Sequence, residues 1–230
     1  MATMHRYDRN KNCISAVEQE GLAQARVCVI GCGGLGGYNI EMLARVGIGH
    51  ISAIDGDVFD VSNLNRQLYS DMDVIGQGKA DVAARRVHAF NPDITITPIK
   101  AFVSEENAKE LLENHDIIVD SLDNIETRKT VAKLCQQLNI PFVYGAIAGW
   151  YGQVSTIMPG DQTLEKLYRS KVKSGAEKKL GNPSFTPALI ASMQVAEVVK
   201  ILTQKGDILQ NKVLFIDTLD HEYWVQPLLE

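Results

Sequence analysis

The sequence lacks the features of secreted, membrane-spanning and disulfide-linked proteins. Its N-terminus carries no apolar signal segment, and no apolar run approaches the ~18 residues that indicate a membrane span. Cysteine is scarce, with four residues at the irregular positions 13, 28, 32 and 135, a usage typical of a reducing compartment. We therefore expect a cytoplasmic protein without a membrane partner.

A large excess of positive charge is also missing. The formal net charge is -5 at pH 7, whereas general nucleic-acid binders usually carry a basic face. Cysteine pairs with zinc-ligand spacing are missing too, because Cys28 and Cys32 are separated by three residues across the end of an expected strand. The sequence thus predicts no nucleic-acid partner and no zinc site.

Apolar strands and amphipathic helices alternate through the first part of the chain. Strands are expected at 26–30, 50–55, 94–99, 116–120 and 141–144. Helices are expected at 35–46, at 79–90, from Ser104 as the N-cap, and at 126–138. This alternation is typical of βαβ units, so we predict an α/β fold with a mostly parallel sheet and helices on both faces.

The pattern changes toward the C-terminus. Strands are expected at 154–158, 212–217 and 222–227, the last two forming an antiparallel extension. Thr186 should cap a helix that begins at Pro187, and because residues 188–202 are apolar on nearly every face, this helix should be buried. Residues 161–186 show no strong periodicity, so we predict one domain with an insertion there.

A glycine-rich loop follows the first strand and opens the first helix. Its sequence, Gly31-Cys-Gly33-Gly34-Leu-Gly36, fits the G-x-G-x-x-G pattern, in which backbone N–H groups at a helix N-terminus approach a phosphate. Asp55 ends the next strand, where a carboxylate can bind ribose hydroxyls. These features predict a nucleotide site in a Rossmann-like fold. Taken alone, they also suit an NAD-dependent oxidoreductase.

Polar and basic residues follow Asp55 on the same side of the expected sheet. They comprise Asp57, Ser62, Asn63, Arg66, Gln67 and Lys79. Hydride transfer has little use for two cations and several amides, whereas a site that holds three phosphates and stabilises charge at the α-phosphate needs them. ATP is therefore the favoured nucleotide.

Asp123 and Asn124 follow the strand at 116–120, at the carboxyl edge of the sheet. Beside phosphates, Asp123 would hold Mg²⁺, which takes oxygen ligands from carboxylate, phosphate and water. The alternative is that Asp123 only caps the following helix. The presence of Arg66 and Lys79 favours the magnesium site.

Together these segments resemble the ThiF/MoeB/HesA family, the bacterial relatives of ubiquitin-activating enzymes. The resemblance spans nearly the whole chain and lies in residues 6–9, 29–36, 55–57, 62–67, 78–79, 91–92, 120–124, 152–153 and 192–200. It implies an adenylyltransferase that joins AMP to the terminal glycine carboxylate of a ubiquitin-like sulfur-carrier protein ending in Gly-Gly, of thiamine or molybdopterin type, and that releases pyrophosphate.

The resemblance also implies roles for individual residues. Those implied to hold the adenosine side of ATP are Gly33, Gly34 and Asp55. Those implied to contact phosphates or Mg²⁺ are Asn63, Arg66, Lys79 and Asp123. The other candidates for the nucleotide site are Gly31, Gly36, Asp57, Ser62, Gln67 and Asn124. Arg9 stands where such enzymes send an arginine into the neighbouring subunit's site, which implies a homodimer and adds Arg9 to the catalytic residues Arg66, Lys79 and Asp123.

On this resemblance the single domain, residues 1–230, has three parts: an N-terminal dimer arm at 1–25, a nucleotide-binding half at 26–147 and a partner-binding half at 148–230. Its crossover loop, 161–186, lacks the cysteine that members often use for persulfide or thioester chemistry. The loop instead carries basic residues, namely Lys166, Arg169, Lys171, Lys173, Lys178 and Lys179. It is either a solvated connector or a mobile cover over the partner's tail.

Three other interpretations remain open. The first is an NAD-dependent oxidoreductase that shares only the glycine loop. The second is a non-catalytic subunit, against which the joint presence of Arg9, Arg66, Lys79 and Asp123 argues. The third is adenylation of a small-molecule or RNA-linked carboxylate instead of a protein.

Overall fold

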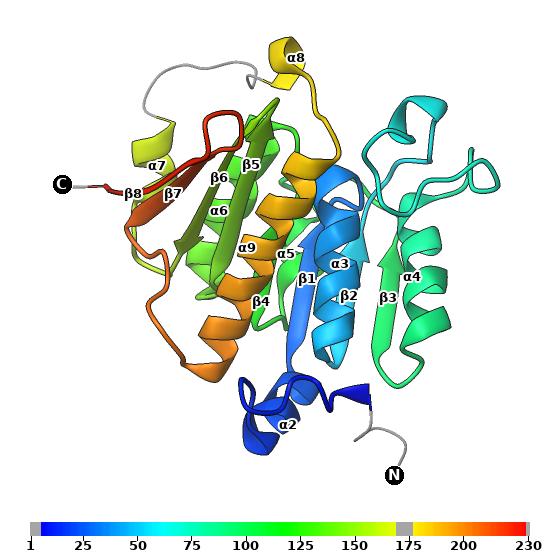
Figure 1. Ribbon diagram of the computed structural model, residues 1–230, viewed down its shortest axis with the longest axis horizontal. Helices are drawn as coiled ribbons and strands as arrows, with labels where there is room; N and C mark the ends of the chain where they lie inside the picture. The colour runs from blue at the N-terminus through cyan, green and yellow to red at the C-terminus, as the bar shows by residue number, and fades with distance from the viewer. Residues whose placement is uncertain (1–5, 169–176, 229–230) are drawn as a thin grey trace.

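The computed structural model describes residues 6–168 and 177–228. It contains an eight-stranded sheet in the order β3-β2-β1-β4-β5-β6-β7-β8, with helices on both faces (Figure 1). The strands are β1 (Arg26–Ile30), β2 (His50–Ile54), β3 (Thr95–Ile99), β4 (Ile117–Asp120), β5 (Phe142–Ala148), β6 (Tyr151–Ile157), β7 (Lys212–Asp217) and β8 (Glu222–Pro227). The helices are α2 (Ala16–Gln24), α3 (Gly34–Val46), the 3-10 helix η1 (Val61–Asn63), α4 (Lys79–Phe90), α5 (Ala108–Leu112), α6 (Ile125–Leu138), α7 (Thr163–Leu167), α8 (Glu177–Leu180) and α9 (Phe185–Thr203).

The sheet has a parallel and an antiparallel half. β3, β2, β1, β4 and β5 run parallel, and most of the connections between them contain a helix. The pairs β5–β6, β6–β7 and β7–β8 are antiparallel. Short turns connect β5 to β6 and β7 to β8, whereas the long segment with α7, α8 and α9 connects β6 to β7. The predicted α/β class, the mostly parallel sheet and the antiparallel extension are confirmed.

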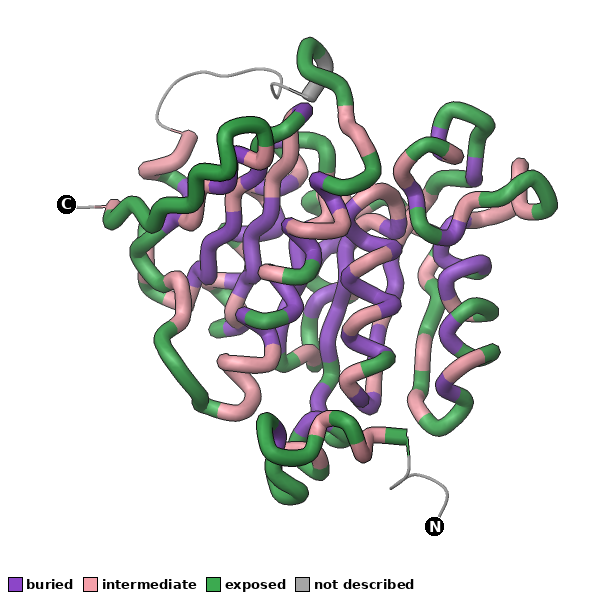
Figure 2. The backbone as a smooth tube through the Cα atoms, in the orientation of Figure 1, coloured by how far each residue is buried: buried purple, intermediate pink, exposed green. Residues whose placement is uncertain are grey.

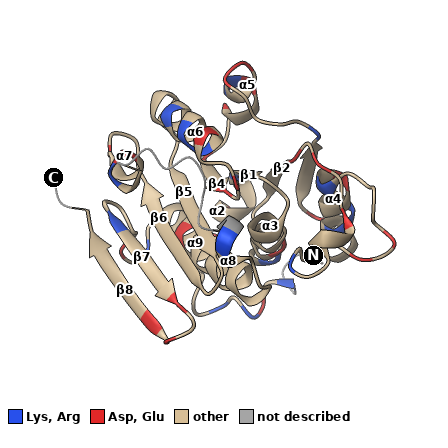
Figure 3. Cartoon of the chain, turned by 90° about the horizontal axis from the view of Figure 1, so that it is seen from above, with Lys and Arg blue, Asp and Glu red and all other residues tan. Residues whose placement is uncertain are grey.

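Each face of the sheet has its own apolar core, because side chains alternate along a strand. In β1, Val27 and Val29 pack with residues of α3, α4 and α9, while Cys28 and Ile30 pack with residues of α5 and α6. Seen from above, α5 and α6 lie on one side of the sheet and α3 and α9 on the other (Figure 3). Burial on both faces explains why the central strands read as continuous apolar runs (Figure 2).

A buried side-chain amide joins α9 to the sheet. Gln194 Nε2 donates hydrogen bonds to the carbonyl oxygens of Asp120 (2.7 Å) and Val143 (3.1 Å). Asp120 is the last residue of β4, and Val143 lies within β5. Its Oε1 accepts one from Asn39 Nδ2 of α3, at 2.9 Å. Room for this amide exists because Gly145 has no side chain: a Cβ there would lie 2.4 Å from Gln194 Cδ.

Helix α9 buries much of its surface, as predicted, and packs on α3, β5, β6 and α2. With nineteen residues, α9 is long and apolar enough to cross a membrane, although the sequence predicted no such span. It is the one such helix in the described ranges. Its neighbours give it the role of a core helix.

Two predicted helix starts are wrong. α5 begins at Ala108, not after Ser104, because Asn107 Oδ1 accepts the Ser104 N–H and holds residues 104–107 in a turn. α9 begins at Phe185, so Thr186 lies inside its first turn, and the Thr186 hydroxyl donates to the Gly149 carbonyl instead of capping the helix. In neither case does the hydroxyl cap the helix, because the Ser104 hydroxyl donates to the Glu106 carboxylate and the Thr186 hydroxyl to a backbone carbonyl.

The segment 161–186 is more regular than its sequence suggests, because α7, α8 and the first residues of α9 fall within it. Three of its basic residues, Arg169, Lys171 and Lys173, lie outside the described residues. Whether the loop is a connector or a cover therefore stays a prediction.

Replacing Gly145 with alanine should destabilise the fold, because the new Cβ overlaps the buried Gln194 amide. We expect a loss of about 1–3 kcal/mol in the free energy of unfolding, measured by urea titration. Gly21→Ala is the matched control: position 21 lies in α2 with nothing within 4 Å of an added Cβ, so this change should stabilise by about 0.5–1 kcal/mol. Equal effects of the two changes would contradict the packing described for Gln194.

Candidate active site

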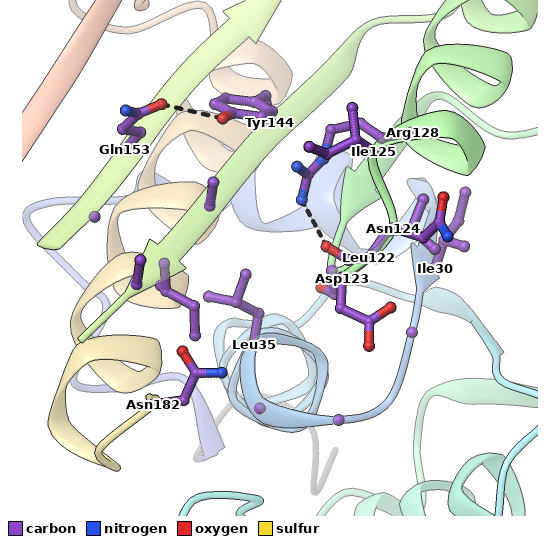
Figure 4. A pocket seen from close by; sticks show the side chains of 18 of the residues that line it. Ile30, Leu35, Leu122, Asp123, Asn124, Ile125, Arg128, Tyr144, Gln153 and Asn182 are labelled. Carbon is purple, nitrogen blue, oxygen red and sulfur yellow. Dashed lines mark hydrogen bonds between the residues drawn. The ribbon is translucent and has the colours of Figure 1, made fainter. Parts of the chain in front are cut away.

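A cavity of about 740 Å³ opens at the carboxyl ends of β1, β2 and β4 and continues over β5 to β8 (Figure 4). This volume suits a nucleotide-sized ligand. Most of the candidate residues from the sequence line it: Gly31, Gly33, Gly34, Asp55, Asp57, Arg66, Gln67, Lys79, Asp123 and Asn124. The candidates outside the cavity are Arg9, Gly36, Ser62 and Asn63.

The glycine loop depends on close backbone contacts. Gly31 has φ +96°, and a Cβ there would lie 2.5 Å from the Ser121 carbonyl oxygen. A Cβ at Gly36 would lie 1.8 Å from the Gly31 carbonyl oxygen, so Gly36 serves packing of helix on strand. Gly33 is the N-cap of α3 and offers no side-chain acceptor. The first N–H groups of α3 are therefore available to an anion.

Asp55 connects the end of β2 to this loop. Its Oδ2 accepts the Cys32 N–H at 2.7 Å, and its Oδ1 accepts the Asp57 N–H at 2.8 Å. Burial raises the pKa of the Asp55 carboxyl, and these two N–H donors oppose that rise. Each oxygen keeps a further lone pair, so the carboxylate can still accept hydrogen bonds from ribose hydroxyls.

Lys79 is the first residue of α4 and its side chain is only 9% exposed. Its Nζ lies 3.2 Å from Asp57 Oδ2, on a carboxylate that is 59% exposed. An ammonium carries three donors, so the ion pair leaves donors for a phosphate. The charge of Asp57 keeps the lysine in place beside the cavity.

Arg66 and Gln67 come from the segment after η1. Arg66 Nη1 donates to the Ser62 carbonyl (2.9 Å) and to Asn65 Oδ1 (2.8 Å), which leaves the other guanidinium donors without a protein acceptor among the described residues. Gln67 Oε1 is buried and has no hydrogen-bond partner there. A Cβ at Gly33 would be 3.4 Å from Gln67 Nε2, so this amide lies against the glycine loop.

Ser62 and Asn63 support the segment from outside the cavity. Asn63 Oδ1 accepts the Asp60 N–H at 3.0 Å, and Asp60 Oδ1 accepts the Ser62 N–H at 2.8 Å, which caps η1 reciprocally. The Asn63 side chain is buried in this role. A phosphate contact by Ser62 or Asn63 stays a prediction.

The alternative that Asp123 caps α6 is wrong. Asn124 is the N-cap, and its Oδ1 accepts the N–H groups of Glu126 (2.9 Å) and Thr127 (3.0 Å). Asp123 is exposed to the cavity and has no hydrogen-bond or ion-pair partner in the described part of the chain. That part also contains no cluster of three or more His, Cys, Asp or Glu residues, so a Mg²⁺ ion would need phosphate and water oxygens besides Asp123.

Comparison with known proteins identifies the family. The sequence model of the ThiF family matches residues 7–229. The chain belongs to the ThiF family. It is 34% identical to the SAMP-activating enzyme E1 of Haloferax volcanii over 212 residues. This alignment covers 91% of this chain and 78% of that enzyme. It is 31% identical over 217 residues to the molybdopterin-synthase adenylyltransferase of Salmonella typhimurium, covering 92% and 86%.

A solved structure of a similar protein supports the same fold. The crystal structure of Escherichia coli MccB with succinimide is 25% identical, with a TM-score of 0.83, and the match covers 97% of this chain and 71% of MccB. A further relative, the sulfur carrier protein ThiS adenylyltransferase of Bacillus subtilis, is 37% identical over 189 residues, which cover 80% of this chain and 56% of that enzyme. Family membership was thus predicted correctly from the motifs.

Sequence reasoning missed one buried residue of this ThiF family site. Arg128 Nε donates to Asp120 Oδ2 at 2.5 Å, and Nη1 donates to the Tyr168 hydroxyl at 2.7 Å. Nη2 donates to the Leu122 carbonyl at 2.6 Å (Figure 4), while Asp120 Oδ1 accepts the Leu122 N–H at 3.0 Å. The available signal was an arginine at helical spacing from Val131 and Cys135 on the apolar face of α6.

The pair of Asp120 and Arg128 fixes the loop that precedes Asp123. The Leu122 N–H donates to Asp120, and the Leu122 carbonyl accepts from Arg128. Burial raises the pKa of the Asp120 carboxyl, and the charge of Arg128 opposes the rise. Removing one partner would leave the other charged and buried, which is strongly unfavourable. The position of the Asp123 backbone is therefore set before any ligand binds.

Arg9 lies far from the cavity of its own chain. Its neighbour Tyr7 packs on Gly47, the C-cap of α3, and the Tyr7 hydroxyl accepts a hydrogen bond from Asn91 Nδ2 at 2.9 Å. α3 starts at the cavity and its thirteen residues carry the chain about 20 Å away, to the opposite edge of the sheet (Figure 1). Arg9 cannot complete the site of its own subunit.

The four cysteines of this ThiF family chain are free, and three of them are buried. Burial raises the pKa of Cys28, Cys32 and Cys135, that of Cys135 to about 12. Among the described residues that line the cavity, none is a cysteine. Although Cys32 belongs to the glycine loop, its thiol is in the core with Val29 and Ile40.

Native protein should therefore react with Ellman's reagent at one thiol. Cys13 is exposed, whereas the other three thiols are inaccessible and, because of their raised pKa, contain little thiolate near pH 8. We expect one rapid equivalent from native protein, none from Cys13→Ser, and four after unfolding in urea. A second rapid equivalent in the native state would show that one of the three buried thiols becomes exposed and would contradict their burial.

Proposed function

We propose that this chain is an ATP-dependent adenylyltransferase that activates the C-terminal glycine carboxylate of a ubiquitin-like sulfur-carrier protein ending in Gly-Gly. The observation that carries the proposal is the cavity itself: an uncapped helix N-terminus, two cations and the unpartnered Asp123 share it with the antiparallel half of the sheet. The relatives, an E1 and two adenylyltransferases by name, support the same reaction.

The residues present fit ATP. Because Gly31 and Gly36 lack a Cβ, the loop and α3 pack closely, and the uncapped N-terminus of α3 leaves its first N–H groups for a phosphate. The unpaired Gln67 Oε1 marks a buried polar position that lacks a partner in the protein. Asp55 would hold the ribose, while Arg66 and Lys79 would bind the β- and γ-phosphates.

In the proposed reaction an acceptor carboxylate oxygen attacks the α-phosphorus of ATP. A bond forms between that oxygen and phosphorus, the bond from phosphorus to the α–β bridging oxygen breaks, and pyrophosphate leaves. Arg66 and Lys79 would stabilise the negative charge that builds on the leaving group. Mg²⁺, held by Asp123, would neutralise phosphate oxygens during this transfer.

We further propose that the enzyme is a homodimer with shared sites and resides in the cytoplasm. The dimer proposal is supported by Arg9, which is exposed and is near Tyr7, the residue that packs on Gly47 at the end of α3 remote from the cavity. In a partner subunit it could add a third cation to the phosphate end. The proposed location is supported by four cysteines without a disulfide.

Replacing Asp123 with alanine should lower the rate of Mg²⁺-dependent ATP–pyrophosphate exchange by about 10²–10³-fold, because a carboxylate aimed at the transferring phosphates is lost. Exchange is measured with a sulfur carrier ending in Gly-Gly. Glu126→Ala removes the same charge from the first turn of α6, outside the cavity, and should leave the rate within about twofold. Full activity of Asp123→Ala would refute the proposed role of this residue.

Mixed dimers test the action of Arg9. Arg9→Ala and Asp123→Ala chains should each be nearly inactive alone, since each removes one charge from every site. Unfolded together and refolded, they should regain roughly a quarter of the wild-type activity at equal mixing, because half of the dimers are mixed and one of their two sites is intact. No recovery in heterodimers isolated by two affinity tags would rule out action between subunits.

A further inference from the structure

The segment between α8 and α9 places one carboxamide in the cavity. Asn182 is among the residues that line it (Figure 4). Its Oδ1 is buried and has no hydrogen-bond partner among residues 6–168 and 177–228. A buried acceptor without a hydrogen-bond partner is unfavourable. Nothing in the fold described above uses this side chain.

The backbone at this position is held from two sides. The Gly149 N–H, at the turn between β5 and β6, donates to the Gly181 carbonyl at 2.7 Å. Asn65 Nδ2 donates to the Asn182 carbonyl at 3.2 Å, and Asn65 Oδ1 in turn accepts from Arg66 Nη1 at 2.8 Å. Asn182 therefore lies between the arginine of the phosphate end and the antiparallel half of the sheet.

The chemistry of a carboxamide limits what can satisfy it. It presents an acceptor and donors in one plane, and the matching partner is another amide, such as a peptide bond. A lone carboxylate offers acceptors only, so it would leave Asn182 Oδ1 unpaired. Ala148, Tyr151 and Phe215 of the antiparallel half also line the cavity, and this part has room for the chain that precedes the reacting carboxylate.

We propose that Asn182 is a specificity-determining residue that pairs with the last peptide bond of the acceptor, directly before its reacting carboxylate. Asn182 thereby selects a peptidyl carboxylate over a small-molecule one. The inference rests on the proposed adenylation reaction. Asn182 affects binding of the acceptor and not of ATP.

The test uses two forms of one sulfur carrier ending in Gly-Gly, made by semisynthesis. In the second form glycolate replaces the last glycine, so that an ester takes the place of the last peptide bond and its N–H is lost. For wild type we expect kcat/KM in ATP–pyrophosphate exchange to be about tenfold lower with the ester carrier. Asn182→Leu should lose about the same factor with the amide carrier and show an ester-to-amide ratio near one.

Ser184→Ala is the matched control. Ser184 belongs to the same segment, does not line the cavity and makes no side-chain cap on α9, so its ester-to-amide ratio should equal that of wild type. The KM for ATP should be unchanged in both variants, and the urea unfolding curve of Asn182→Leu shows that the variant is folded. If Asn182→Leu does not fold, Asn182→Ala takes its place.

The outcomes separate the two proposals. No exchange by wild type with the amide carrier would overturn the adenylation proposal. Exchange by wild type with an ester-to-amide ratio near one would overturn the inference about Asn182 alone, as would a tenfold ratio that persists in Asn182→Leu. A raised KM for ATP in Asn182→Leu would place the residue at the nucleotide instead and would also overturn it.

Discussion

The buried amide of Gln194 is the interaction on which the geometry of the cavity depends. It bonds at once to α3, to the last residue of β4 and to β5, the three elements that carry the glycine loop, the Asp123 loop and the start of the antiparallel half. A buried amide that loses one of these partners pays a desolvation penalty of about 1–3 kcal/mol. The three elements are therefore held in one relative position, and Gly145 leaves the space that this requires.

A second buried side chain, that of Arg128, continues this hydrogen-bond network toward the antiparallel half of the sheet. Arg128 is bonded to Asp120, to the backbone of the Asp123 loop and to Tyr168, which follows α7. The Tyr144 hydroxyl lies 3.1 Å from that of Tyr168 and donates to Gln153 Oε1 on β6. Polar contacts thus run without a gap from the nucleotide end to the antiparallel strands. A site fixed in this way needs little reorganisation when charge develops in the reaction, which is the condition for electrostatic catalysis.

Local signals were enough to predict the parts of the protein whose structure depends on near neighbours. Alternation of strands and helices predicted the sheet, and the glycine loop with Asp55 predicted the edge of the sheet at which the cavity lies. Side-chain contacts that periodicity does not reveal decided the errors at Ser104 and Thr186 and the omission of Arg128. Some of these partners are near in sequence, as Asn107 is to Ser104, and others are distant. Thr186 bonds to Gly149, 37 residues earlier, and Gln194 to Asp120, 74 residues earlier. Asn182 escaped notice because its importance lies in a partner that the fold does not supply.

The distance along the chain between Gln194 and Asp120 has a consequence for the order of events during synthesis. On the ribosome, β1 to β5 and the glycine loop emerge well before α9. Until α9 docks, the carbonyl groups of Asp120 and Val143 lack the donor that joins them, and α3, β5 and β6 lack the helix that packs on them. A nascent chain that stops before α9 therefore has the glycine loop, Arg66, Lys79 and Asp123, the candidate phosphate-binding residues, but no rigid site in which to arrange them. Nucleotide binding becomes available only late in translation, as a property of the nearly finished chain.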